Sequence, residues 1–289
     1  MPIRHILGTQ YEKNIGVLKM KKKIVAILLA VLMLTMLMSG CQKPAADDAD
    51  TARTFTVGFD AEFPPYGYID DNGDYDGFDL ALAAEVCDRL GWELKLQAIV
   101  WDSKDAELES GNIDCIWNGF TKSEERADQY TWTVPYVDNS QVIVVRNDSG
   151  IASLADLAGK TVMVQAGSSA LSALESEDCA DLTATFGDLL EVADYNAGFM
   201  ELENGTVDAI AMDIGVANYQ IATRGGGYTI LDEAIATEVY AVGFLLGNTD
   251  LMYTVQGVLM EMAYDGTMLE IAEKYVDKGL VIDSLCLLD

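Results

Sequence analysis

After its first fifty residues the chain alternates short apolar runs with amphipathic stretches. Residues 55–59, 93–99 and 113–117 are runs of β-type composition, and we predict strands there. Apolar residues recur every four positions over residues 78–90, which predicts a helix that ends at Gly91. Strands that alternate with helices in this way predict parallel βαβ units and therefore an α/β fold.

The second half of the chain repeats this order, with a strand predicted over residues 160–165, a helix over 168–177 and a strand over 207–212. Two segments are also similar in sequence, LESGNIDCIWN at residues 108–118 and LENGTVDAIAMD at residues 202–213. Each has a helix end, a glycine, an apolar strand and a polar residue at the exit of the strand. We therefore expect two α/β lobes that are built alike.

The last part of the chain is predicted to return to the first lobe. A further β-type run covers residues 236–246, and two helices follow within residues 250–278. Two strands then cross between the lobes and form a hinge. The organisation we expect is a lobe 1 from residues 54–143 plus 242–289 and a lobe 2 from residues 144–241, each with a doubly wound sheet.

The first forty residues have the pattern of a secretory signal. A basic stretch, KMKKK at residues 19–23, precedes an uninterrupted apolar run over residues 24–38. This run is shorter than the roughly 20 residues of a membrane-spanning helix. We therefore expect residues 1–40 to be a signal peptide, with an uncleaved anchor helix as the alternative. Met20 is the more natural start, so residues 1–19 are interpreted as an over-extended reading frame.

A cysteine follows the apolar run at once. The sequence Met38-Ser39-Gly40-Cys41 resembles a bacterial lipoprotein box, which implies cleavage before Cys41 and a lipid on its sulfur. Residues 41–53 are polar and are predicted to be a lipidated tether. The protein would then be held by its lipid on the outer face of the bacterial cell membrane.

Charge and residue counts exclude several classes of function. With 18 Lys and Arg against 47 Asp and Glu, the net charge is −29, and nucleic acid is a poor partner for such a surface. The one histidine, His5, gives no basis for a histidine-ligated metal or a Ser-His-Asp triad. We expect no metal, no cofactor and, by default, a monomer.

The remaining cysteines are widely spaced and form no CxxC pair, which disfavours a zinc site. Cys115 lies in an apolar strand pattern and Cys87 on the apolar face of a helix, so buried free thiols are expected there. A disulfide between any two of the four stays an alternative. The four are Cys87, Cys115, Cys179 and Cys286.

Polar residues follow the predicted strands at their carboxyl ends, where open parallel sheets bind ligands. Asp60 and Glu62 follow the first strand, and residues 118–121 follow a later one. Residues 167–169 follow the strand that opens lobe 2, and Asp213 ends the later strand of that lobe. We expect the binding site among these residues.

Two of these features suit a zwitterion, together with Arg126, which lies shortly after residues 118–121. Gly167-Ser168-Ser169 begins a helix, whose free N–H groups favour a small anion, although a simple helix cap is the alternative. The guanidinium of Arg126 can bind a carboxylate through two parallel hydrogen bonds. The alternative is an ion pair of Arg126 with Glu124 or Asp128 on the surface. Asp213 could pair with an ammonium group, or cap the helix that follows it.

Aromatic residues near the same strand ends would supply the walls. Phe63 stands in the turn Asp60-Ala61-Glu62-Phe63-Pro64-Pro65-Tyr66, and Trp101 follows the strand at residues 93–99. Each alone is more often part of the core than of a pocket. Together with one cation and one anion they suit a molecule that has a carboxylate, an ammonium group and a partly apolar side chain, which is an α-amino acid.

Five blocks of sequence resemble the polar amino-acid-binding proteins of bacterial ABC importers, which are extracellular solute-binding proteins of family 3. The resemblance implies a type II periplasmic-binding-protein-like fold, a polar L-α-amino acid as ligand and an importer permease as partner. The blocks occur in the family's order over about residues 55–275 and read FTVGFDAEFPPYGYID, GDYDGFDLALAAEVCDRLGW, LESGNIDCIWNGFTKSEERADQYTWTVPY, DLAGKTVMVQAGSS and LENGTVDAIAMD.

The resemblance also implies how the α-carboxylate would be bound. Arg126 would clamp it together with Thr121 and the backbone N–H of Ser169. Many family members have two threonines where this chain has Ser168 and Ser169, a change that keeps the backbone donors.

The α-ammonium would be held by Asp213, by the hydroxyl of Thr121 and by the carbonyl of Asn118 or Gly119. The family often has a serine at the position of Gly119, so a hydroxyl is missing here. This departure weakens any transfer of one member's ligand preference to this chain.

The side chain of the ligand would lie between Phe63 and Trp101, with Asp60 at its polar end. Two other functions are alternatives: a secreted dehydratase of the same fold acting on a cyclic amino acid, with Asp60 or Glu62 as general acid, and a sensor that transports nothing. No histidine and no lysine is expected near these motifs, which disfavours the enzyme.

Overall fold

The computed structural model describes residues 52–288. The predicted signal peptide, Cys41 and most of the predicted tether lie outside the described residues. Among the residues described, none of the helices is both long enough and apolar enough to cross a membrane.

Lobe 1 is built on a five-stranded sheet in the order β5-β1-β6-β15-β8. The first three strands are parallel, and β15 runs antiparallel to both of its neighbours. Phe55, Val57 and Phe59 of β1 are fully buried, which explains why this apolar run forms a central strand. The strands are β1 (Thr54–Phe59), β5 (Glu93–Ala98), β6 (Cys115–Ile116), β8 (Tyr130–Trp132) and β15 (Gly243–Leu245).

Helices cover this sheet as the apolar spacing predicts. In α2 the residues Phe78, Leu82 and Val86 are buried, and Gly91 ends the helix in the left-handed conformation that glycine adopts without strain. The helices of lobe 1 are α2 (Phe78–Leu90), α3 (Lys104–Glu109), α8 (Thr249–Asp265) and α9 (Thr267–Ala272), with short 3-10 helices η1 (Trp101–Ser103), η3 (Glu273–Lys278) and η4 (Ile282–Ser284).

Lobe 2 contains a second sheet in the order β11-β10-β12-β9-β14-β7, and β13 also pairs with β9. Its strands are β7 (Thr121–Lys122), β9 (Val137–Arg146), β10 (Thr161–Gln165), β11 (Asp188–Val192), β12 (Ala209–Asp213), β13 (Tyr228–Ile230) and β14 (Ala236–Tyr240). Its helices are η2 (Leu154–Leu157), α4 (Ser169–Glu175), α5 (Ala180–Thr183), α6 (Tyr195–Asn204) and α7 (Ile214–Thr223).

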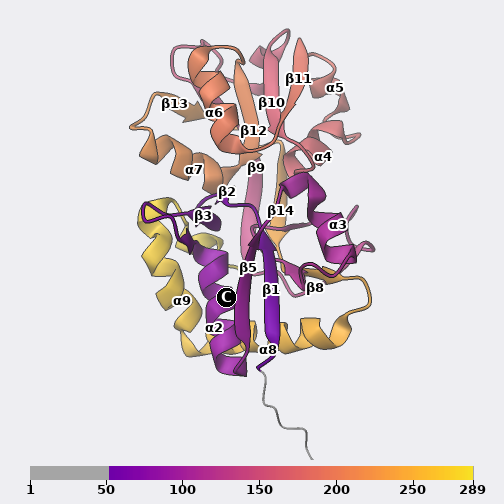
Figure 1. Cartoon of the computed structure of the whole chain (residues 1–289). Helices are drawn as coiled ribbons and strands as arrows, with labels where there is room; N and C mark the ends of the chain where they lie inside the picture. The colour runs from indigo at the N-terminus through magenta and orange to yellow at the C-terminus, as the bar shows by residue number, and fades with distance from the viewer. Residues whose placement is uncertain (1–51, 289) are drawn as a thin grey trace, which may run out of the picture. The chain divides into compact units, whose positions relative to one another are not determined.

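Two antiparallel strands connect the lobes: β9 and β14 are paired in the lobe 2 sheet, and Figure 1 shows them extending from that sheet toward lobe 1. Their register pairs Val137 with Tyr240 and Gln141 with Ala236. This confirms the predicted two-lobe α/β fold with a two-strand hinge. Both sheets are mixed, although the pattern predicts parallel units, because β15 is antiparallel to its neighbours in lobe 1 and β9 is antiparallel to its neighbours in lobe 2.

The β-type run at residues 236–246 forms two strands and not one. The chain leaves the lobe 2 sheet after β14, passes Ala241 and Val242, and enters the lobe 1 sheet as β15. A small antiparallel sheet, formed by β2 (Glu62–Phe63), β3 (Gly67–Ile69) and β4 (Tyr75–Asp76), follows β1 and carries the Asp60 to Tyr66 turn.

Cys87, Cys115 and Cys179 belong to the packing of the fold. Cys87, Cys115 and Cys179 are buried and form no disulfide. The predicted buried thiols at Cys87 and Cys115 are therefore confirmed.

Candidate functional site

The carboxyl ends of the central strands of both sheets lie close to each other. Asp60, directly after β1 of lobe 1, accepts a hydrogen bond on Oδ2 from Nε2 of Gln165, the last residue of β10 in lobe 2, at 2.6 Å. Thr121 and Ser169 are also in contact, with 3.0 Å between their hydroxyl oxygens. The strand-end residues that the sequence singled out therefore lie in one region between the sheets.

An acidic pair lies at one end of this region: Asp213, which is buried, and Glu238, which is partly buried. Oδ1 of Asp213 accepts hydrogen bonds from Nδ2 of Asn139 at 2.7 Å, from Nε2 of Gln141 at 2.6 Å and from the hydroxyl of Tyr240 at 2.7 Å. The same two amide groups donate to Oε1 of Glu238, each at 2.7 Å. Asp213 starts α7 but its side chain makes no capping hydrogen bond, so the capping interpretation does not hold.

Glu238 is a residue that the sequence reasoning missed. Its Oε1 also accepts from the hydroxyl of Thr121 at 2.6 Å and from that of Ser169 at 3.2 Å. The available signal was a carboxylate in the middle of the β-type run that became β14. Burial, and then the charge of Glu238, raise the pKa of Asp213 to about 7.

Arg126 lies in the turn after β7 and is 9% exposed. Its Nη2 is 3.5 Å from the carbonyl oxygen of Gly167, and its guanidinium carbon lies 5.5 Å from the centre of the Phe120 ring. Within the described residues it forms no ion pair, so the expected alternative with Glu124 or Asp128 is not found. Its charge therefore has no anionic partner in this part of the chain.

The Gly167 to Ser169 turn combines capping with contacts to the acidic pair. The predicted helix at residues 168–177 is shorter, with Ser168 as N-cap, and the Ser168 hydroxyl accepts from the N–H of Leu171 at 3.2 Å. Ser168 thus does what the capping interpretation says. The Ser169 hydroxyl, in contrast, accepts from Gln141 at 2.9 Å and turns toward Glu238.

Two aromatic rings form a parallel pair in lobe 1. The ring planes of Phe63 and Trp101 differ by 7° and their centroids are 6.5 Å apart. Contact between stacked carbon atoms takes about 3.5–4 Å, so a flat group between two rings needs a spacing of about 7 Å. The two ring planes are at most 6.5 Å apart, so the rings are oriented to stack on a planar side chain but have to separate slightly to admit it.

A lysine lies next to this pair, so the expectation of no lysine near the motifs is wrong. Nζ of Lys104 is 5.4 Å from the centre of the Trp101 ring and 3.1 Å from the Gly167 carbonyl oxygen. The pattern gave no sign of this, because Lys104 is an ordinary polar residue at the start of a short helix.

Asn118 and Gly119 hold the strand end of lobe 1 in shape. Oδ1 of Asn118 accepts the N–H of Asp60 at 2.9 Å, and the N–H of Gly119 donates to Oδ2 of Asp79 at 2.6 Å. Gly119 has φ +53, and a side chain there would come within 2.7 Å of the Phe63 ring. The close approach of Phe63 thus accounts for the missing hydroxyl at residue 119.

Burial raises the pKa of Asp60 to about 6.

A cavity of about 430 Å³ opens beside the site. Arg126 and Ser169 line it, and so does Glu238, which connects it to the acidic pair. Its other lining residues are Ser123, Glu124, Glu125, Ser172, Ala173, Ser176, Asp178, Cys179, Ile235, Ala236 and Thr237.

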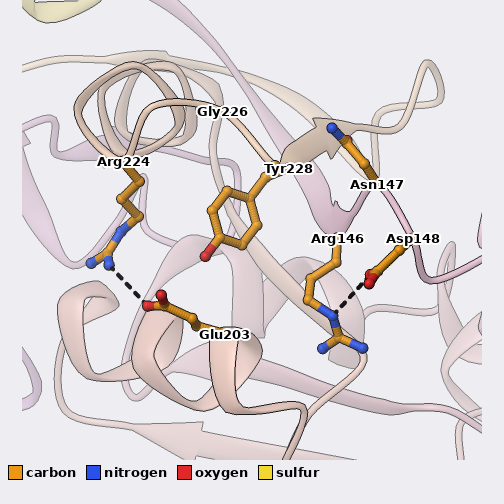
Figure 2. Close-up of a pocket in the computed structure, with 8 residues that line it drawn as sticks. Arg146, Asn147, Asp148, Glu203, Arg224, Gly226 and Tyr228 are labelled. Atoms are coloured by element: carbon orange, nitrogen blue, oxygen red, sulfur yellow. Dashed lines mark hydrogen bonds and ion pairs between the residues drawn. The ribbon is translucent and has the colours of Figure 1, made fainter.

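A second cavity, of about 550 Å³, lies in lobe 2 at the end of β9 (Figure 2) and contains none of the strand-end residues. Its two arginines are already paired: Arg224 with Glu203 at 3.8 Å, and Arg146 with Asp148 at 3.3 Å. Arg146 also donates to the Leu202 carbonyl at 2.6 Å, so it closes the end of α6. We therefore assign the candidate site to the strand ends and not to this cavity.

Comparison with known proteins identifies the class. Residues 55–278 match the bacterial extracellular solute-binding proteins, family 3. The L-cystine-binding protein TcyJ of Escherichia coli K12 is 29% identical over 224 residues, which cover 77% of this chain and 82% of TcyJ. The chain belongs to this family of solute-binding proteins.

Solved structures support the same fold. A substrate-binding protein of an ABC uptake transporter from Streptococcus pneumoniae, with bound histidine, has a TM-score of 0.75 at 32% identity and covers 79% of this chain and 94% of its own. An ancestral arginine-binding protein bound to arginine has a TM-score of 0.71 at 35% identity. The match covers 77% of this chain and 97% of the ancestral protein.

Proposed function

We propose that this protein is an extracytoplasmic receptor that binds a polar L-α-amino acid between its lobes and delivers it to an ABC importer permease. The observation that carries the proposal is the separation of charge in the site. Arg126 is buried at one end with no anionic partner in the described residues, and Asp213 and Glu238 share the other end. This arrangement is complementary to a zwitterion.

Each end of the site has donors and acceptors suited to one ligand group. The guanidinium of Arg126, the Thr121 hydroxyl and the N–H of Ser169 would bind the α-carboxylate. Asp213, with Thr121 and a carbonyl of Asn118 or Gly119, would bind the α-ammonium. Glu238 adds a second carboxylate beside Asp213, which strengthens the preference for a cation there.

Closure of the hinge would complete the site. Asp60 follows β1 of lobe 1, and the Arg126 carbonyl accepts a hydrogen bond from Nε1 of Trp132 in β8 of the same lobe, whereas Ser169 and Asp213 lie in lobe 2. A ligand that contacts both sets stabilises the closed arrangement by its differential affinity for it. The permease would then recognise the closed form.

The aromatic pair and Asp60 favour a flat, polar side chain. Phe63 and Trp101 would enclose it, and a cationic side chain over these rings would gain a cation–π contact. Asp60 would meet its polar end. The named ligands of the related proteins, cystine, histidine and arginine, all have polar L-α-amino-acid groups.

A thermal-shift screen against the twenty L-amino acids and L-cystine tests the proposal. The protein is first unfolded and refolded to remove any ligand carried through purification. A ligand that binds only the folded state raises the melting temperature, by an amount that grows with its concentration over Kd. We expect a clear rise for one or a few polar amino acids. A panel without any rise would contradict the receptor function.

We also propose that the receptor is held at the membrane by a lipid on Cys41. The support is the sequence alone, a signal-type segment followed by Met38-Ser39-Gly40-Cys41. When the protein is expressed in a bacterial host supplied with labelled palmitate, we expect the wild type to incorporate the label and Cys41→Ser to incorporate none. Equal labelling of the two proteins, or no label in the wild type, would count against the lipid anchor.

We propose no catalytic step. The groups at the site are arranged as paired contacts for opposite charges, and membership of a solute-binding family agrees with a binding role. No group of three potential metal ligands occurs among residues 52–288.

A further inference from the structure

Lys104 is a buried lysine inside the candidate site. It is the first residue of α3 and is 5% exposed, which is rare for a lysine unless it has a partner. Its Nζ donates to the carbonyl oxygen of Gly167 at 3.1 Å, across from lobe 1 to lobe 2. The side chain therefore reaches the turn where the proposed ligand carboxylate would lie.

Two cations meet at this one carbonyl oxygen. Nη2 of Arg126 is 3.5 Å from the same Gly167 oxygen. In the part of the chain that the structure describes, neither cation has a carboxylate within the 4.0 Å of an ion pair. A neutral carbonyl compensates two buried positive charges poorly.

The electrostatics of Lys104 point the same way. Burial, together with the nearby charge of Arg126, lowers its pKa, while Asp105 and Asp102 act in the opposite direction. An anion placed between Lys104 and Arg126 would favour the charged form of Lys104.

Gly167 leaves the space in which the two cations meet. Its φ is +65, and a side chain there would come within 2.9 Å of Oδ1 of Asp102 and 3.3 Å of Nζ of Lys104. Any other residue at this position would be strained by the positive φ and would displace the Asp102 carboxylate, and it would crowd Lys104 at the turn.

We propose that Lys104 is a second cationic contact for the ligand's α-carboxylate, beside Arg126. The proposal rests on the proposed amino-acid-binding function. Arg126 supplies a planar fork and Lys104 a compact point charge, so the carboxylate is held from two sides. The site would then discriminate strongly between a free α-carboxylate and its neutral amide, because the amide leaves two buried cations without an anion.

The test compares two ligands and two variants by calorimetry. Lys104→Met removes the charge and keeps a side chain of similar reach, and Lys95→Met is the control, since Lys95 is an exposed lysine of β5 in the same lobe. The ligands are L-arginine and L-histidine with their α-carboxamides; if neither amino acid binds, the tightest binder of the thermal-shift panel and its α-carboxamide replace them.

For the amino acid we expect Lys104→Met to raise Kd by about 10- to 100-fold, the range for losing a charge-assisted contact in a buried site. For the α-carboxamide we expect a change below about threefold, and Lys95→Met should leave both values unchanged. If Lys104→Met does not fold, Lys104→Gln carries the same expectation, because its slightly shorter side chain offers an N–H donor to Gly167 without the charge.

Three outcomes would overturn the proposal. An unchanged Kd in Lys104→Met would show that Lys104 does not contact the carboxylate. An equal loss for the acid and the amide would make Lys104 a contact between the lobes only. Failure of the wild-type protein to bind any amino acid would instead reject the proposed function, and this inference with it.

Discussion

Replacing Arg126 by alanine is expected to weaken amino-acid binding by about 2–5 kcal/mol, or roughly 30- to 4,000-fold in Kd. The guanidinium is buried beside Gly167 and has no ion pair within the described residues, so the ligand carboxylate is its natural partner. Much of the loss comes from leaving that carboxylate without a cation in a site shielded from water. Arg126→Lys should recover part of it, because it restores the charge but not the fork.

Arg53→Ala is the matched control for this variant. Arg53 is half exposed, lies at the start of lobe 1 and pairs with Asp114 at 3.7 Å, so its loss changes the net charge equally but not the site. Calorimetry should give a wild-type Kd for Arg53→Ala. A Kd near wild type for Arg126→Ala, in a protein that melts normally, would remove Arg126 from the site.

Much of the fold followed from the spacing of apolar residues. The helix at residues 78–90 and the strands at 55–59, 93–99 and 160–165 are all found within about one residue of their expected ends. The boundary between β14 and β15 within residues 236–246 was harder to predict, because both halves of this run are β-type. That a strand changes sheet at Ala241 depends on pairing with distant segments, which a local pattern does not contain.

The candidate site could be located from the sequence only as far as it lies at strand ends. Asp60, Ser169 and Asp213 follow recognisable strands, so topology alone brings them together. Glu238 lies inside a strand, and Lys104 reaches the site only because the lobes approach each other at Gly167. Their roles depend on tertiary contacts, and no motif marks them.

Replacing Asp213 by asparagine is also expected to weaken binding by about 2–5 kcal/mol, because it removes the buried charge opposite the α-ammonium. Asparagine keeps the size of the side chain, and its oxygen can still accept from Asn139, Gln141 or Tyr240. Asp138→Asn is the control: Asp138 precedes Asn139 on β9, is exposed and carries the same charge. It should bind the amino acid like the wild type.

The pH dependence of affinity tests whether the ionised form of Asp213 is what binds. Burial and the charge of Glu238 raise the pKa of Asp213 to about 7, and a bound ammonium lowers it by favouring the carboxylate. Binding then displaces a proton below about pH 7, so affinity falls as the pH falls, with a limiting slope of about tenfold in Kd for each pH unit.

The pKa of Asp60 is about 6, and any contribution of Asp60 to the pH dependence persists in both the wild type and Asp213→Asn. Calorimetry from pH 5 to 8 should therefore give a shallower profile for Asp213→Asn than for the wild type. Parallel profiles would mean that Asp213 is not the group whose proton the ligand displaces.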